Sequence, residues 1–434
     1  MKSVFIDLEE IITMTSITAT REITESLAAS PNQKYWDIGL KCFNDGEVAT
    51  TAIQRIWAAM APPASLNVLA SIVGSLYGDT YWATTKMDGN KLALDLQAAL
   101  GINPNDCQKA ANFAFSKWYG LMVRANFSDA GAIPKLGSLS ASPDVIANGK
   151  AALTVQQLIA MWNVYVWDPQ PNLKNNCYGR AQSINIQVPV TKPVLRMYYS
   201  DAGFNPPPTS WIQMFTFTGS SPVSDMQGTT PGPVPVGGRV ANIDSFAFTP
   251  AGSGHYCMIA AVGTEFFTNN PLDTPGNWNS MEWLTNNGAA GWHNVDVPQG
   301  RDSLLKFYNQ DSTPEHFAFE AHSAKVPAGT IISLGFADKQ LAQSQPTQSV
   351  KIVKGYEVVG TEIEVPPHYT GDLRLSIDGK PLPADASVDV RLYWRIPPGH
   401  RNYLQAVDHL GDIRALNQRT EVHVPLGNFT FIGK

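Results

Sequence analysis

The segment Glu315–His322 carries the side chains best suited to metal chemistry. In its sequence, E-H-F-A-F-E-A-H, two imidazoles and a carboxylate alternate with apolar residues. Because side chains two residues apart in a strand share a face, His316, Glu320 and His322 are predicted to project together. Such a set could bind zinc. However, about 20 Å of strand separates His316 from His322. We therefore favour the interpretation that these side chains form the solvent-exposed face of a half-buried strand, and we expect no metal or other cofactor.

Three tryptophans within one connection form the best candidate for a glycan or partner site. They are Trp278, Trp283 and Trp292, in a segment rich in asparagine. Exposed indole rings can stack on sugar rings, and amides can bind sugar hydroxyls. The competing interpretation is packing, with Trp292 in the core and Trp283 on a short helix. Trp211, which follows a run of prolines, marks a weaker patch of the same kind.

The cysteines do not form a recognisable catalytic or metal-binding set. His255 and Cys257 could act as a base and its nucleophile, but alternation turns both toward the core and no carboxylate is placed to orient the imidazole. All four cysteines are widely spaced, without a C-x-x-C pair, and are expected to be small buried residues. They are Cys42, Cys107, Cys177 and Cys257. The one disulfide we consider is Cys177 with Cys257.

Composition and charge exclude several function classes. The chain has 434 residues, which is too long for one ordinary core, so two or three domains are expected. The net charge is −6 and there is no basic run, so neither nucleic acid nor an anionic membrane surface is an expected partner. No hydrolase, nucleotide-binding or zinc-protease motif is present, so we expect no catalysis.

The N-terminal region does not resemble a secretory signal. Asp7, Glu9 and Glu10 interrupt the place where a signal peptide needs an apolar core. The longest apolar stretch, Leu66–Tyr77, is too short to span a bilayer. The protein is therefore expected to be soluble when made. The sequence does not determine its compartment, and export would require a route other than a secretory signal peptide.

Residues 1–176 are predicted to form a helical bundle. Asn103 before Pro104, and Thr154 with Gln157, are helix-capping patterns. The segment Leu66–Tyr77 is apolar nearly all round, which indicates the central helix of the bundle. Apolar stripes at helical spacing occur at Ile53, Ile56, Trp57 and Met60, at Phe115, Trp118, Tyr119 and Met122, and at Val155, Leu158, Ile159 and Trp162.

Two antiparallel β-sandwiches are predicted after the helical domain, over residues 177–345 and 346–434. Short alternating segments separated by loops rich in Pro, Gly and Asn are typical of this architecture. In the second unit, Asp378-Gly379 is a strong hairpin signal. The fold class is therefore multidomain α+β. The strand candidates of the first unit are Val194–Tyr199, Trp211–Thr218, Val240–Thr249, Tyr256–Val262, Trp292–Val297, Leu304–Tyr308, Phe317–Ala321 and Ile331–Phe336.

One part of the chain resembles a known family. The segments G-H-Y-C-M-I-A and N-N-G-A-A-G-W-H-N-V, within residues 245–297, are similar to the immunoglobulin-like accessory domains of bacterial secreted and surface proteins. The resemblance implies that the Cys257 side chain packs inside a sandwich. It also implies that Asn286, Asn287 and Asn294 hold a loop by hydrogen bonds to backbone. These roles are structural, and the helical half resembles no family that we can name.

The sequence favours a non-catalytic structural protein that acts in assembly, display or adhesion. Low charge, wide apolar helix faces and long loops suit repeated contacts with copies of itself, or with a protein or glycan of a host surface. Two alternatives stay open. One is an insecticidal pore-forming toxin whose Leu66–Tyr77 helix enters a membrane, the one case in which a membrane partner is expected. The other is a glycan-acting hydrolase with an accessory sandwich.

Overall fold

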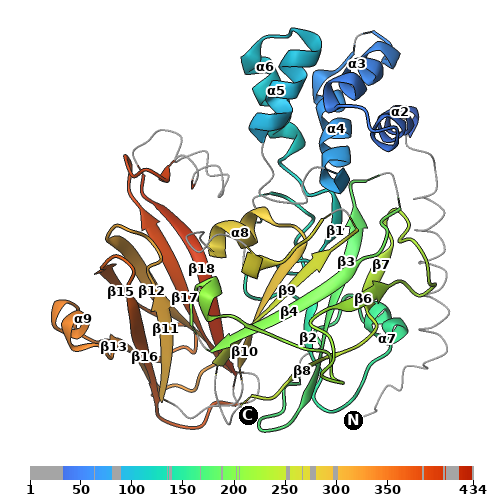
Figure 1. Ribbon diagram of the computed structural model, residues 1–434. Helices are drawn as coiled ribbons and strands as arrows, with labels where there is room; N and C mark the ends of the chain where they lie inside the picture. Colours follow the sequence, from blue (N-terminus) through green and yellow to red (C-terminus); the bar gives the residue numbers. More distant parts are fainter. Residues whose placement is uncertain are drawn as a thin grey trace.

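The computed structural model describes most of the chain from residue 33 onward. The described residues are 33–62, 64–80, 89–133, 135, 139–166, 168–186, 189–201, 203–204, 206–250, 255–265, 267–273, 280–296, 302–383, 386–403, 406 and 420–432. The fold is mixed α+β, with an N-terminal helical part followed by antiparallel sheets. Figure 1 shows the helical part at one end of a large sheet, with two smaller sheets beside that sheet.

The helical part is built around α4. Its helices are α2 (Gln33–Asn44), α3 (Ala49–Ala59), α4 (Leu66–Thr80), α5 (Gly89–Leu100) and α6 (Pro104–Ala114). Helix α4 contacts each of the other four, so the prediction of a central helix is confirmed. Among the described residues, no helix is both long and apolar enough to cross a bilayer.

Both predicted helix caps are confirmed. Asn103 Oδ1 accepts a hydrogen bond from the Asn105 N–H at 2.8 Å, where α6 begins. Thr154 and Gln157 form a reciprocal capping box at the start of α7 (Val155–Ala160). Such caps satisfy N–H groups that the first turn of a helix leaves without partners.

The helix predicted across residues 115–122 is wrong. Helix α6 ends at Ala114, and residues Gly120–Met122 form strand β1. Gly120 has a φ of +107°, which a right-handed helix does not contain. The apolar side chains here are buried as predicted, but burial at close spacing does not by itself distinguish a helix from a loop followed by a strand.

Residues 120–296 contribute ten strands to one large antiparallel sheet. The main path is β1-β3-β7-β6-β4-β9-β10, and β2, β5 and β8 branch from it. Strand β3 pairs with four others and contains the expected domain boundary at residue 176. The strands are β1 (Gly120–Met122), β2 (Val145–Ala147), β3 (Asn175–Ile184), β4 (Val194–Asp201), β5 (Ile212–Gln213), β6 (Ser224–Gln227), β7 (Arg239–Asn242), β8 (Phe246–Phe248), β9 (His255–Gly263) and β10 (Ala290–Asp296).

Residues 302–432 form two four-stranded sheets that pack face to face, here called the C-terminal β-sandwich. Their orders are β11-β16-β13-β14 and β15-β12-β17-β18. Phe307 on β11 and Phe319 on β12 contact across the interface, with ring centroids 4.9 Å apart. The strands are β11 (Asp302–Tyr308), β12 (Glu315–Ala324), β13 (Ile331–Phe336), β14 (Gln348–Lys351), β15 (Val358–Val365), β16 (Thr370–Asp378), β17 (Ser387–Ile396) and β18 (Val422–Ile432).

These pairings do not coincide with the expected division at residue 345. Strand β12 pairs with β15 and β17, and β13 pairs with β14 and β16, so each sheet combines strands from both sides of that position. The expected hairpin at Asp378-Gly379 is also wrong, because β16 and β17 belong to different sheets. Alternation locates strands, but partners far apart in sequence depend on tertiary packing.

Short helices and shared cores complete the fold. The short elements are α7, α8 (Ser280–Asn286), α9 (Lys339–Ser344), and the 3₁₀ turns η1 (Pro208–Ser210) and η2 (Pro271–Asp273). One core joins the helical part to the large sheet, with Phe115 and Trp118 packed in the same cluster as Val145 and Cys177. A second core joins the other face of β9 and β10 to the C-terminal β-sandwich.

A buried ion pair holds the segment between β1 and β3 on the large sheet. Arg124 binds Asp144 bidentately, through Nε to Oδ2 at 2.9 Å and Nη2 to Oδ1 at 2.7 Å. Arg180 on β3 places its Nε 3.3 Å from the same carboxylate, without hydrogen-bond alignment. The indole of Trp162 covers Arg124, with its centroid 4.0 Å from the guanidinium carbon. All four side chains are buried.

Replacing Asp144 with Asn tests this arrangement. The substitution keeps the shape but leaves two guanidinium groups buried without a counter-charge, so the free energy of unfolding should fall by about 3–5 kcal/mol. Urea denaturation followed by tryptophan fluorescence measures the loss. Asp45→Asn, at the exposed Lys41–Asp45 pair, is the control and should change stability little. Equal losses in the two variants would contradict the assignment.

Candidate interaction site

The tryptophans predicted to bind a glycan or partner pack against one another. The Trp211 ring centroid lies 5.9 Å from that of Trp283 and 5.7 Å from that of Trp292, in edge-to-face arrangements. Trp211 and Trp292 are only 6% and 3% exposed, and Trp283 lies partly buried on α8. This is core packing, and it leaves Trp211 and Trp292 no open ring face for a sugar. Trp278 lies outside the described residues.

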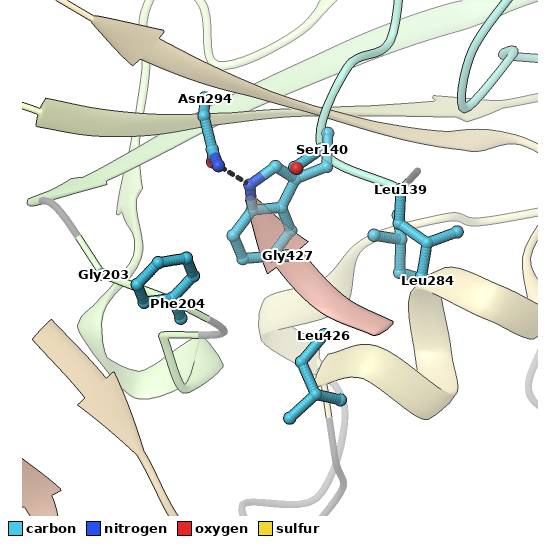
Figure 2. A pocket seen from close by; sticks show the side chains of 9 residues that line it. Leu139, Ser140, Gly203, Phe204, Leu284, Asn294, Leu426 and Gly427 are labelled. Carbon is cyan, nitrogen blue, oxygen red and sulfur yellow. Dashed lines mark hydrogen bonds between the residues drawn. The ribbon is translucent and has the colours of Figure 1, made fainter. Parts of the chain in front are cut away.

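A polar junction joins the large sheet to the C-terminal β-sandwich, with Asn294 of β10 at its centre. Asn294 Oδ1 accepts hydrogen bonds from the Trp292 indole N–H at 2.9 Å and from the Cys257 thiol at 3.3 Å. Its Nδ2 donates to the backbone carbonyl of Asn428 on β18. Figure 2 shows the bond between Asn294 and the indole nitrogen. Cys257 is buried as expected, but the Asn294 amide bonds to the backbone of strand β18 and not to a loop.

Asn428 and Ser140 complete the junction, and sequence reasoning missed both. The Ser140 hydroxyl donates to Asn428 Oδ1 at 2.5 Å and accepts from the Asn428 N–H at 3.1 Å. Asn428 Nδ2 in turn donates to Asp389 Oδ1 at 2.9 Å. Because 288 positions separate Ser140 from Asn428, no local pattern in the sequence connects them.

The junction encloses a small pocket, drawn in Figure 2. Its free volume is about 10 Å³, which admits about one water molecule. A pocket of this size is packing space between the two β units and does not hold a substrate. It is lined by Leu139, Ser140, Gly203, Phe204, Leu284, Trp292, Asn294, Leu426 and Gly427.

A buried amide pair supports the turn before β10. Asn287 Nδ2 donates to Asn269 Oδ1 at 2.9 Å, and Asn287 Oδ1 accepts from the Ala289 N–H at 3.0 Å. Asn269 Nδ2 donates to the backbone carbonyls of Val262 and Ala289. The prediction that Asn287 holds a loop through backbone bonds is thus confirmed.

The cysteines of the described chain are buried and form no disulfide, so the bond considered between Cys177 and Cys257 is absent. Cys177 lies on β3 and Cys257 on β9, and these strands do not pair. Burial raises the pKa of the Cys177 thiol, which keeps it protonated and unreactive. The side chain of His255 lies outside the described residues, so its pairing with Cys257 stays a prediction.

The predicted metal-binding side chains lie on the outward face of sheet β15-β12-β17-β18, here called the outer face. His316 Nε2 lies 3.4 Å from the Glu364 carboxylate on β15, and His322 Nε2 lies 2.8 Å from Glu320. The shared face is as expected for a strand, but the two histidines engage separate carboxylates. Among the residues that the structure describes, no group of three His, Cys, Asp or Glu side chains could hold a metal ion.

Strand β17 places Arg391, Tyr393 and Arg395 at successive outward positions in the middle of the outer face. Arg395 binds Glu362 on β15 and, at 2.6 Å, Glu421 beside β18, so it links carboxylates from both edges of the sheet. The hydrogen bond to Glu421 raises the pKa of Arg395. The alternating pattern of this strand was visible in the sequence, but the position of the strand at the centre of a sheet was not.

A second missed feature is the buried carboxylate of Glu315, at the start of β12. It accepts hydrogen bonds from the Trp394 indole at 2.8 Å, the Thr313 hydroxyl at 2.8 Å and Arg401 at 3.1 Å. His400 Nε2 also lies 3.2 Å from it. Because this carboxylate is fully engaged, it fastens the connection after β17 to β12.

His293 on β10 holds the segment that carries Ser140. Its Nδ1 donates to the Ser142 carbonyl at 2.7 Å, and the ring contacts Tyr165 edge to face. Burial lowers the pKa of His293 to about 4. The folded protein therefore keeps this imidazole neutral at a pH where the unfolded chain would protonate it.

Stability should depend on pH through His293. As the pH falls from 6.5 toward 4, the unfolded chain binds a proton that the folded chain does not, so the stability present above pH 6.5 is lost progressively. His293→Asn keeps a donor near the Ser142 carbonyl without this titration. The difference in unfolding free energy between wild type and variant should shrink across this range in urea titrations. A constant difference would contradict the assignment.

Asn294→Ala tests the junction. The variant leaves the Trp292 indole N–H and the Asn428 carbonyl without their partner, which should cost about 1–3 kcal/mol. Thermal unfolding monitored by circular dichroism measures the change. Asn163→Ala removes an exposed amide and should have little effect. An Asn294→Ala variant as stable as this control would show that the junction does not depend on the amide.

Comparisons with known proteins do not place the chain in a family. No protein-family model matches it, and no curated protein matches it. One similar solved structure, of manganese lipoxygenase of Gaeumannomyces graminis with part of zonadhesin of Komagataella pastoris, has 8% identity and a TM-score of 0.15, over 67% of this chain and 96% of that chain. Another, the CFA/I adhesin CfaE of enterotoxigenic E. coli, has 11% identity and a TM-score of 0.14, over 73% and 92%. Likeness at this level carries no argument about fold or function.

Proposed function

We propose that this chain is a non-catalytic structural protein that works by protein–protein contact, through the outer face of the C-terminal β-sandwich. The observation that carries the proposal is the row Arg391, Tyr393 and Arg395 at the centre of that face. Arginine and tyrosine are among the residue types that contribute most binding energy at protein interfaces. Here they occupy successive outward positions on one strand, flanked by neighbouring strands of the same sheet.

The charges of the outer face support contact with a second copy of the chain. Each carboxylate named on this face already has a cationic or histidine partner, so the side chains are held in place before any partner arrives. Fixed groups of both signs favour a partner with a complementary pattern and disfavour random association. A second copy presents the same two signs and can meet them in a symmetric contact.

The immunoglobulin-like resemblance of residues 245–297 extends this proposal. Domains of that kind serve display and adhesion, so the same face could meet a host-surface protein after assembly. The buried tryptophans give no support to the glycan version. The toxin and hydrolase alternatives stay untested predictions, and neither gains a specific observation from the described residues.

Charge reversal on the outer face tests the proposal. Wild type is expected to self-associate as its concentration is raised, and Arg391→Glu/Arg395→Glu should shift the assembly toward monomer in light scattering after size exclusion. The matched control is Arg374→Glu/Lys339→Glu, two exposed cations outside the outer face, which should associate like wild type. Tyr393→Ala is a milder second variant in case the double reversal disturbs folding. A wild type that stays monomeric, or a control that dissociates equally, would overturn the proposal.

A further inference from the structure

Three connections meet at one end of the C-terminal β-sandwich and form a projecting surface, here called the lysine tip. They are residues 325–330 between β12 and β13, residues 352–357 between β14 and β15, and the start of the β16–β17 connection at residues 379–380. Ile331 is the register partner of Lys351 on one side and of Asp378 on the other. The Gly329 N–H also donates to the Ile352 carbonyl at 2.8 Å.

The central loop of the lysine tip has a fixed conformation. Glu357 Oε1 accepts hydrogen bonds from the backbone N–H groups of Val353 at 2.9 Å and Lys354 at 2.7 Å. The Glu357 N–H donates to the Ser323 hydroxyl at 2.7 Å, which ties the loop to β12. Gly355 has a φ of +84°, which glycine adopts without strain. A loop ordered in advance loses little conformational entropy when it binds.

The lysine tip carries large apolar side chains that are exposed in the described structure. Val353 and Tyr356 are 70% and 67% exposed, the two highest values among the large apolar residues that the structure describes. Val358 and Ile331 beside them are also exposed. Large exposed apolar side chains held together on a rigid loop mark a contact surface.

Lysines surround these apolar side chains. Lys325 and Lys380 come from the outer connections, and Lys351 and Lys354 flank Val353; all four are exposed. Among the described residues of these connections and strand ends, the acidic ones are Asp378 and Glu357, and the Glu357 carboxylate accepts hydrogen bonds from the backbone. The surface is therefore locally cationic in a chain whose net charge is −6. These lysines come from three separate segments of the sequence, so they form no basic run, and only folding brings them together.

We propose that the lysine tip docks on an anionic phospholipid membrane surface, with Val353 and Tyr356 entering the headgroup region and the lysines binding lipid phosphates. The cations of the described lysine tip are all lysines, and lysine is depleted at protein–protein interfaces. Each lysine close to anionic lipids adds to membrane binding, so the composition favours lipid over protein as the partner. Tyrosine and aliphatic side chains are suited to the boundary between headgroups and acyl chains. The proposed contact is peripheral, and the lysine tip does not cross the bilayer. This proposal is an alternative to the expectation that no anionic membrane surface would be bound, which stays a prediction.

Vesicle co-sedimentation tests the proposal with the full chain. Wild type should bind vesicles of phosphatidylcholine with phosphatidylserine, bind pure phosphatidylcholine weakly, and lose binding as salt is raised. Lys351→Gln/Lys354→Gln should lower partitioning onto the mixed vesicles about 30-fold. Val353→Ser/Tyr356→Ser should lower it about tenfold. The matched control is Val48→Ser/Leu94→Ser, which removes two apolar side chains that are 63% and 64% exposed on the helical part and should bind like wild type.

Three results would overturn the inference. One is wild type that does not co-sediment with the mixed vesicles. Another is binding that survives both pairs of substitutions at the lysine tip, with near-UV circular dichroism showing that the variants are folded. The third is retention on immobilised polyglutamate without vesicle binding, which would assign the lysine tip to an acidic protein partner instead.

Discussion

The buried carboxylate of Asp144 is the constraint on which the middle of this structure depends. It neutralises Arg124 and approaches Arg180, so the segment between β1 and β3 cannot leave the sheet without exposing two unpaired cations to an apolar interior. That segment carries Ser140, which reaches the C-terminal β-sandwich through Asn428. A charge pair beside β2 therefore helps to position the neighbouring junction on β10.

The junction explains why residues that the sequence offered as binding or catalytic candidates have structural roles. Trp211, Trp283 and Trp292 pack edge to face beneath it, and Cys257 donates its thiol proton to Asn294. Tryptophan and tyrosine recur in binding sites and in cores for the same reason: each combines apolar surface with a directional polar group. What separates the two uses is accessibility, which depends on segments far away in the chain.

The sequence predicted local structure well and tertiary pairing poorly. The caps at Asn103 and Thr154 depend on neighbours within three residues, so their chemistry could be recognised directly. Strand β13 was predicted with its exact bounds, because Ile332, Leu334 and Phe336 alternate with the small residues Ser333 and Gly335. Strand β3 was missed, since a strand buried on both faces lacks alternation and its N-N-C-Y-G-R run resembles a loop. The lysine tip could not be predicted, and for the row on β17 only the alternation could, because the position of each depends on strand order, which a single sequence does not show.

The two continuous cores also link the orientation of one end of the molecule to the orientation of the other. The helical part shares its interior with the large sheet, and β9 and β10 share theirs with the C-terminal β-sandwich. Because both cores are continuous in the described residues, a docking event at one end of the molecule should fix the direction in which the opposite end points. Several copies docked on one flat surface would therefore all have the same orientation relative to that surface. The curvature of an array of such copies would then depend on the shape of a single subunit.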